Sequence, residues 1–231
     1  MNRLFASALL LGLIAAPYEA RANCDSSIIT AIDVSGSIDA QETALQIDGV
    51  AEAISSESVI AAIQSGEHGC INFLVFLWAD GEYPAIVDWT VIASREDAEA
   101  VAAKIMAALQ GITEGMADNN KRNWGTLTNL SGAINHATEA LNGAPPAERI
   151  VLNVIGNGED NVGEDPLRAR TAFIALGATI NGVVVGGDPA VLNYYRNQVI
   201  GGKFARVWVA ATAADVAYTF TLKFSAEIAQ R

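Results

Sequence analysis

The sequence predicts an α/β fold: a doubly wound, mostly parallel sheet with one antiparallel edge strand and helices on both faces. Short apolar, β-branched runs alternate along the chain with longer segments whose apolar residues recur at helical spacing. The run 71–78 is apolar throughout, which is typical of a strand buried on both faces. Asp80-Gly81 is a turn signal before a weakly alternating run, so the hairpin adds one antiparallel strand. Strands that are separated by helices pair in parallel.

Local signals justify each predicted element. Residues 40–55 have apolar positions at helical spacing, and Ser94 to Asp97 resembles a helix capping box. Pro84 fits an edge strand, and Pro145-Pro146 interrupts the chain. We find no repeat or linker, so residues 23–231 are predicted to form one domain. The predicted strands are 27–32, 71–78, 85–91, 150–155, 178–185 and 204–209; the predicted helices are 40–55, 59–63, 94–111, 128–141, 165–176, 190–199 and 213–227, with a polar loop at 112–127.

Composition excludes several classes of protein. The 231 residues are 51% hydrophobic and 17% charged, which is too apolar for a disordered chain. The net charge of -12 argues against binding to nucleic acid or anionic lipid through a basic face. Two cysteines and two histidines are too few for a zinc finger or ribbon. The acidity favours a cation or a basic partner, or serves solubility alone.

Residues 1–22 have the pattern of a secretory signal peptide. Arg3 precedes an uncharged apolar run at 4–16, and Ala20-Arg21-Ala22 places small residues where a signal peptidase cleaves. The run is shorter than the about 20 residues that span a bilayer, and no later segment has the pattern of a membrane span. An N-terminal anchor or a buried first helix is the alternative. The pattern predicts an exported protein, periplasmic or secreted.

Cys24 and Cys70 are the two cysteines of the chain. Both directly precede predicted strands, and export would place them in an oxidising compartment. We therefore expect a disulfide between them, with two separate buried thiols as the alternative.

The first strand ends in Asp33-Val34-Ser35-Gly36-Ser37. Ligands of open α/β sheets bind beyond the carboxyl ends of the strands, and alternate positions place the side chains of Asp33, Ser35 and Ser37 on one side of the turn. Carboxylate and hydroxyl oxygens are hard ligands that suit Mg²⁺, Mn²⁺ or Ca²⁺. The alternative is a helix N-cap with a serine-rich turn. The position after an apolar strand favours a metal site.

With these residues in place, the sequence resembles the von Willebrand factor A domain over roughly 27–228. That family's metal-ion-dependent adhesion site carries Asp-x-Ser-x-Ser and a Thr before a helix in a Gly-Thr-x-x-x-x-Ala-Leu setting. Counting back from Ala133-Ile134 selects Thr128 as the equivalent metal ligand, with Thr126 as its neighbour. A helix cap is the alternative role for Thr128. The resemblance implies the fold and the metal site.

Asn157 stands where the resemblance implies an Asp, in the segment Ile155-Gly156-Asn157-Gly158. An amide oxygen can accept a hydrogen bond from a metal-bound water but carries no charge. Metal affinity is therefore expected to be lower, unless Asp160 or Glu159 compensates. Asn157-Gly158 as a simple tight turn is the alternative. The segments 33–39 and 194–202 also resemble a group of secreted bacterial single-domain proteins of this type, whose function is unknown.

Other chemistry-bearing residues have bland interpretations. His136 lies off the apolar stripe of its helix, so we expect a solvated side chain, and His68 lies in a loop. No Gly-x-Ser-x-Gly or Gly-x-x-x-x-Gly-Lys motif is present. Trp78 borders the predicted metal site but is expected to pack in the core, whereas Trp124 is assigned equally to packing or to contact with a partner.

The sequence as a whole predicts a non-enzymatic exported module that binds a protein partner through a divalent cation. Mg²⁺ is the preferred ion, with Mn²⁺ or Ca²⁺ as alternatives, and the partner would donate a carboxylate. Ser35, Ser37 and Thr128 would bind the ion directly, and Asp33 and Asn157 through water. The alternatives are a metal-dependent phosphoesterase that uses the same cluster, and a structural module whose metal site is weakened or lost.

Overall fold

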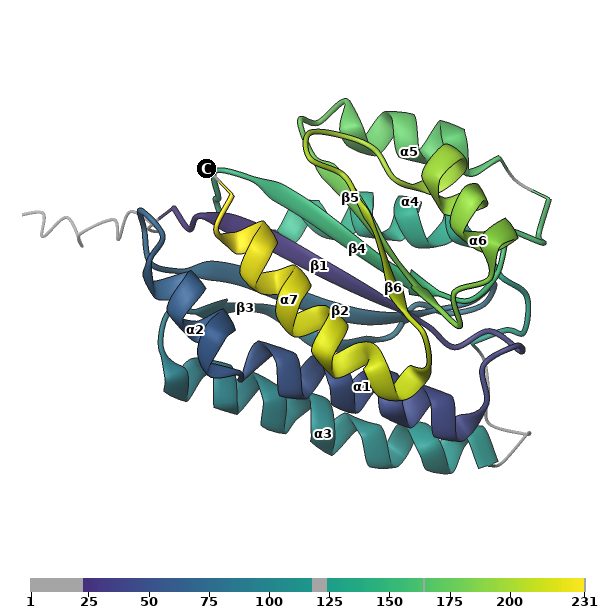
Figure 1. Ribbon diagram of the computed structural model, residues 1–231, viewed down its shortest axis with the longest axis horizontal. Coiled ribbons are helices and arrows are strands. Elements are labelled where there is room, and N and C mark those ends of the chain that lie inside the picture. The colour runs from purple at the N-terminus through teal and green to yellow at the C-terminus, as the bar shows by residue number, and fades with distance from the viewer. Residues whose placement is uncertain (1–22, 118–123, 164, 231) are drawn as a thin grey trace, which may run out of the picture.

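A six-stranded sheet forms the middle layer of the computed structural model (Figure 1), in the order β3-β2-β1-β4-β5-β6. The structure describes residues 23–117, 124–163 and 165–230; the predicted signal peptide and the segment 118–122 lie outside these ranges. The strands are β1 (Ser26–Asp33), β2 (Ile71–Trp78), β3 (Ala85–Ile92), β4 (Ile150–Gly156), β5 (Thr179–Val185) and β6 (Val207–Ala210). The helices are α1 (Ala40–Ile54), α2 (Glu57–Gln64), α3 (Arg95–Ala117), α4 (Leu130–Ala140), α5 (Pro166–Ile174), α6 (Pro189–Tyr194) and α7 (Val216–Ile228).

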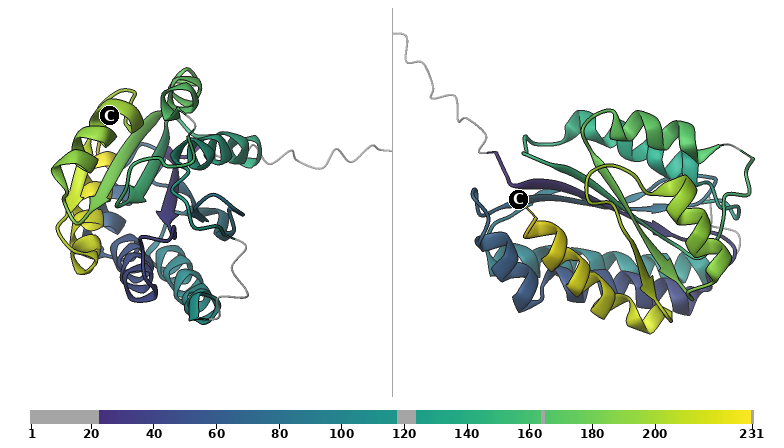
Figure 2. Two further views of the ribbon diagram at one scale, coloured as in Figure 1. Left: turned by 90° about the vertical axis from the view of Figure 1, so that its right-hand side faces the viewer. Right: turned by 45° about the horizontal axis from the view of Figure 1, so that its top comes forward.

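Helices cover both faces of this sheet, as predicted. Helices α1, α2, α3 and α7 lie on one face and α4, α5 and α6 on the other, and the view turned by 90° shows the sheet between them (Figure 2). Successive residues of β1 serve the two cores: Ile28 and Ile32 pack on the α1 side, and Ile29 and Ala31 on the α4 side. Both faces of β1 are therefore buried, which explains its unbroken apolar run.

The strand order places the site. Strand β1 pairs in parallel with β2 and with β4, so the residues that follow these three strands meet at one edge of the sheet. Strand β3 pairs antiparallel with β2, which confirms the predicted hairpin. A disulfide joins Cys24 and Cys70 just before β1 and β2, with a sequence separation of 46 residues. Closing a loop of that size stabilises a protein by roughly 2–4 kcal/mol.

Several boundaries differ from the sequence prediction. Helix α3 continues to Ala117, so the first part of the predicted loop 112–127 is helical. Gly111 does not end the helix because Ile112, seven residues after Ile105, packs in the same core. Helix α6 ends in a π-helical turn at Tyr195–Val199, and the last strand begins at Val207 instead of at Phe204. Within the described residues, no helix has the length and apolar character needed to cross a membrane.

The prediction of a solvated His136 is wrong. Its ring stacks on Tyr83 at 5.0 Å between centroids and meets the edge of Phe76 at 4.7 Å. The hairpin between β2 and β3 covers this flank of α4, which the periodicity of the helix alone does not reveal. Burial lowers the pKa of His136 more than the charge of Glu139 raises it.

This histidine makes stability depend on pH. A folded-state pKa below the unfolded value of 6.5 means that its contribution is fully present above pH 6.5 and is lost as pH falls towards the folded pKa. The wild type is expected to lose stability relative to His136→Phe between pH 7 and pH 5. Urea unfolding of both proteins across this range measures the difference; two parallel pH curves would contradict it.

A buried ion pair anchors α7 to the sheet. Lys223 Nζ lies 2.6 Å from Glu227 Oε2, and both side chains are almost fully buried. Asn181 Nδ2 donates to the same oxygen at 3.0 Å, and Asn153 Nδ2 donates to Glu227 Oε1 at 3.2 Å. Each Glu227 oxygen thus has a partner, which is the condition for burying a charge.

Breaking this pair from one side is expected to destabilise the protein. Lys223→Met leaves Glu227 buried without a cation and should cost about 3–5 kcal/mol, whereas the double variant Lys223→Met/Glu227→Gln should recover most of the loss. Leu222→Met, on the exposed side of α7, is the matched control. Urea unfolding measures all four proteins; a double variant no more stable than Lys223→Met would contradict the explanation.

Candidate metal centre

Asp33 is a buried carboxylate at the carboxyl end of β1. Its Oδ1 accepts a hydrogen bond from the Ser35 backbone N–H at 2.8 Å, and its Oδ2 has no partner among the described residues. Burial raises the pKa of Asp33 from 3.8 to about 6, against the smaller lowering effect of hydrogen bonds from Ser35 and Asn157. Within the described chain no cationic side chain pairs with it.

Three hydroxyl groups gather beside this carboxylate. Ser35 Oγ lies 3.3 Å from Ser37 Oγ and 3.4 Å from Thr128 Oγ1. Neighbouring ligands of an octahedral Mg²⁺ ion lie about 3.0 Å apart, since each sits about 2.1 Å from the ion. Small side-chain movements bring the three oxygens to that spacing. Ser35 and Thr128 are buried and Ser37 is exposed, so the cluster opens to solvent at Ser37.

Asn157 completes the cluster from the loop after β4. Its Oδ1 accepts a hydrogen bond from Ser37 Oγ at 2.7 Å, and its Nδ2 lies 3.5 Å from the Ser37 carbonyl oxygen. The structure therefore brings together all five residues that the sequence singled out: Asp33, Ser35, Ser37, Thr128 and Asn157. The amide supplies an oxygen towards the hydroxyls and no second negative charge.

Thr128 is not the N-cap of α4. Asn129 has that role, because its Oδ1 accepts a hydrogen bond from the Gly132 N–H at 2.7 Å. The Thr128 backbone is held instead by Asn161, whose Oδ1 accepts from the Thr128 N–H at 2.7 Å and whose N–H donates to the Thr128 carbonyl at 3.0 Å. These bonds leave the Thr128 hydroxyl free to face Ser35.

Asp160 supports the same loop and does not face the hydroxyl cluster in place of Asn157. Its Oδ2 accepts from the Leu130 N–H at 2.9 Å, at the start of α4, and its Oδ1 accepts from the Val162 N–H at 3.1 Å. A carboxylate at the first turn of a helix also interacts favourably with the helix dipole. These contacts account for Asp160, so they do not support its proposed compensation for the missing charge.

Asp80 is a supporting residue that the sequence indicated only as part of a turn. Its Oδ1 accepts from the backbone N–H groups of Thr126 and Leu127, at 2.6 and 2.8 Å. Thr126 in turn accepts a hydrogen bond from the Gly36 N–H through its carbonyl oxygen at 2.8 Å. Asp80 thus ties the segment before Thr128 to the Asp33–Ser37 turn. Its position directly after β2 is the signal that could have identified it.

Tyr195 forms the floor beneath Asp33. It is fully buried on the π-helical turn, and its hydroxyl has no hydrogen-bond partner among the described residues. Burial, and then the charge of Asp33, raise the pKa of this hydroxyl well above its ordinary value. A Cβ on Gly156 would lie 2.5 Å from the Tyr195 hydroxyl and 3.0 Å from Asp33 Oδ2. Only glycine at 156 leaves room for both groups.

The two tryptophans near the site pack against the protein. Trp78 is buried and donates from Nε1 to the Ile155 carbonyl at 3.2 Å. Trp124 is half-buried and packs against the core on the α1 side, which favours packing over contact with a partner.

The donor set fits a hard divalent cation held by few charges. The described residues contain no group of three or more His, Cys, Asp or Glu that could hold a metal. All the side-chain atoms that line this cluster towards solvent are oxygens of Ser, Thr and Asn, with one carboxylate behind them. Oxygen donors suit Mg²⁺, Mn²⁺ and Ca²⁺ and exclude soft metals. The metal role of the five residues remains a prediction.

Comparison with solved structures shows the same fold. A von Willebrand factor type A protein from Catenulispora acidiphila matches 89% of this chain and 43% of its own, with 16% identity and a TM-score of 0.60. The vWF domain of the pilus tip protein Mfa5 from Porphyromonas gingivalis matches 90% of this chain and 97% of its own, with 11% identity and a TM-score of 0.60. Proximal thread matrix protein 1 from the mussel byssus, in a structure with a zinc-occupied MIDAS motif, matches 88% of this chain and 48% of its own, with 19% identity and a TM-score of 0.59.

The chain spans about half the length of the mussel protein, so this likeness concerns the fold of that part. No curated protein matches the chain. One family model, described as a protein of unknown function (DUF1194), matches residues 23–231. The chain therefore belongs to the DUF1194 family, and its fold is that of the von Willebrand factor A domain.

Proposed function

We propose that this protein is an exported, non-enzymatic module that binds a protein partner through a divalent cation at the Asp33 cluster. The observation that carries the proposal is the Asp33 carboxylate, which is buried beside three hydroxyl groups without a cationic side chain. A bound cation would neutralise that charge where the chain supplies none. The mussel relative with a zinc-occupied MIDAS motif supports a metal at this place in the fold.

The geometry assigns each residue a role in this proposal. Ser35, Ser37 and Thr128 would bind the ion through their hydroxyl oxygens, because these atoms form the solvent-facing side of the cluster. Asp33 and Asn157 would hold water molecules of the ion from behind, since their oxygens lie one layer deeper or to the side. The cation supplies an open position for a carboxylate from the partner, with Mg²⁺ as the preferred ion.

Export and partner binding rest on separate observations. The Cys24–Cys70 disulfide suits an oxidising compartment, in agreement with a signal peptide at 1–22 and a periplasmic or secreted location. The pilus and byssus proteins among the structural relatives support a role in adhesion or assembly rather than in catalysis. The partner itself is unidentified.

The first test concerns the charge at Asp33. A folded-state pKa raised to about 6 means that the ionised carboxylate destabilises the metal-free protein increasingly as pH rises from 4 through 6. Asp33→Asn should therefore stabilise the metal-free protein at pH 7.5 by up to about 3 kcal/mol, with little effect near pH 4. Added Mg²⁺ should stabilise only the wild type.

Urea unfolding with EDTA or with excess Mg²⁺ measures both effects. Asp165→Asn, an exposed N-cap carboxylate on α5, is the matched control and should keep the response to Mg²⁺. If the wild type and Asp33→Asn respond equally to Mg²⁺, the ion does not bind at this cluster.

The second test concerns the missing second charge. Asn157→Asp restores a carboxylate beside Ser37 and should tighten Mg²⁺ or Mn²⁺ binding at least about tenfold, because affinity follows the number of charged ligands. Titration calorimetry compares the variant with the wild type. Weak wild-type binding that Asp33→Asn removes supports a working site.

Two other outcomes would change the proposal. Binding by Asn157→Asp alone, with no heat from the wild type, would identify a structural module that has lost its metal. Mg²⁺-dependent turnover of a phosphate ester that Ser35→Ala abolishes would establish the phosphoesterase alternative.

A further inference from the structure

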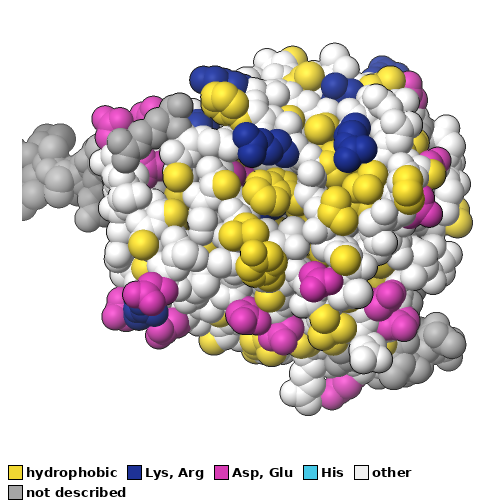
Figure 3. Space-filling model, viewed as in Figure 1, with side chains coloured by type: hydrophobic (Ala, Val, Ile, Leu, Met, Phe, Trp, Pro, Cys, Tyr) yellow, Lys and Arg dark blue, Asp and Glu magenta, His cyan; other side chains and the backbone are white. Residues whose placement is uncertain are grey.

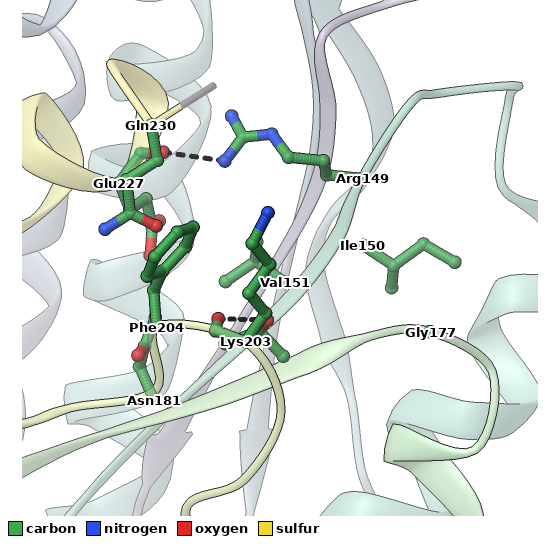
Figure 4. Close-up of a pocket in the computed structure, with 10 residues that line it drawn as sticks. Arg149, Ile150, Val151, Gly177, Asn181, Lys203, Phe204, Glu227 and Gln230 are labelled. Atoms are coloured by element: carbon green, nitrogen blue, oxygen red, sulfur yellow. Dashed lines mark hydrogen bonds between the residues drawn. The ribbon is translucent and has the colours of Figure 1, made fainter.

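A second hollow lies at the opposite end of the sheet, where β4 and β5 begin (Figure 4). Arg149 and Val151 line it from the start of β4, Thr179 from β5, Lys203 and Phe204 from the turn before β6, and Glu227 from α7. Its volume is about 90 Å³. One water molecule needs only about 10–15 Å³ of such space, whereas drug-sized ligands occupy about 300 Å³ or more. The hollow therefore has the size for one small group.

Two cationic side chains extend towards the same space (Figure 4). Arg149 donates three hydrogen bonds, to the Glu227 and Ile228 carbonyls and to Ser26 Oγ, and a guanidinium has five donors. Lys203 is exposed and, among the described residues, pairs with no carboxylate. Two like charges that converge without an anion leave donors that an anionic ligand would satisfy.

The carboxylate of the hollow is already neutralised. Glu227 is bound by Lys223, Asn181 and Asn153, as described above. The side chains around the hollow thus carry three positive charges against one negative charge. Asp25, Glu67 and Glu148 lie near Arg149 but line a separate hollow. The positive excess is therefore concentrated on the side of Lys203.

Phe204 is the second unusual feature. Among the described residues it is the one non-glycine residue with a positive φ, 62°, and its ring is 51% exposed. The Lys203 ammonium lies 4.8 Å from the centre of this ring. An exposed aromatic ring on a strained backbone contributes little to the core. Strain of this kind is concentrated at ligand sites, and here it holds an apolar surface beside the two cations.

The surrounding segment differs in charge from the rest of the chain. Residues 166–210 contain five Lys or Arg and one acidic residue, a net of +4, whereas the whole chain has a net charge of -12. Figure 3 shows Lys and Arg side chains gathered over the upper part of this face, with apolar side chains between them. Anions that approach this face therefore meet a favourable local field.

We propose that this hollow binds a carboxylate carried on an apolar body. Lys203 and the remaining donors of Arg149 would bind the carboxylate, and Phe204 and Val151 would contact the apolar part. A carboxylate fits better than a phosphate because the hollow offers two cationic groups beside an apolar wall. The natural source is either the C-terminal residue of a peptide or a free organic acid.

Backbone amide NMR titration of the purified protein in EDTA tests the proposal without involving the metal cluster. The probes are N-acetylphenylalanine for a peptide end and hydrocinnamate for a free acid, each with its neutral amide as a control. We expect millimolar binding, as suits so small a ligand, with shifts at Thr179, Lys203 and Phe204. The tighter of the two acids identifies the source, and the amides should bind at least about tenfold more weakly.

Two variants separate binding from folding. Lys203→Gln changes an exposed residue and should weaken acid binding about tenfold. Phe204→Gly removes the ring at a backbone conformation that suits glycine, so it should weaken binding about fivefold while leaving the thermal unfolding midpoint unchanged or higher. Lys104→Gln, an exposed cation on α3, is the matched control and should bind as the wild type does.

Three results would overturn the proposal. These are no amide shifts with either acid at tens of millimolar, amides that bind as well as the acids, and inorganic phosphate that binds as tightly as the acids to both the wild type and Phe204→Gly. The last result would mean a general anion patch without an apolar contact.

Discussion

The burial of the Asp33 carboxylate without a cationic side chain is the constraint on which the site depends. The chain buries a second carboxylate, Glu227, and there it supplies Lys223 at 2.6 Å and two amide donors. Asp33 has the Ser35 N–H on one oxygen and no partner on the other among the described residues. The two carboxylates differ in what is left for something else to provide, and a cation is what the Asp33 cluster lacks.

Neighbouring residues are selected around that carboxylate. Strand β4 ends in Gly156 because any side chain there would meet both Asp33 and the Tyr195 hydroxyl. The segment that delivers Thr128 is held from two sides, by Asp80 after β2 and by Asn161 after β4. Three adjacent strand ends thus fix one cluster, so the hydroxyl groups are in place before any ligand arrives. Such preorganisation reduces the conformational cost of binding.

The sequence predicts this arrangement as far as chain order determines it. Asp33, Thr128 and Asn157 could be placed together because each follows a strand or opens a helix at the same edge of a parallel sheet. Tyr195, Asp80 and the contact of His136 with Tyr83 could not, since they depend on how loops and a hairpin fold back over the sheet. The end of α3 was misplaced for a similar reason: a buried Ile112 outweighs the local preference of Gly111 to end a helix.

The charge distribution separates attraction at contact from attraction at a distance. A net charge of -12 repels an acidic partner from afar, yet both proposed sites offer local positive charge, one through a cation and one through Lys203 and Arg149. Exposed charges interact over about 8 Å at physiological ionic strength, so salt screens the long-range repulsion more than the contacts within a hollow. Acidic partners of this protein should therefore approach faster at moderate salt than at low salt, which is the opposite of complexes steered by complementary net charge.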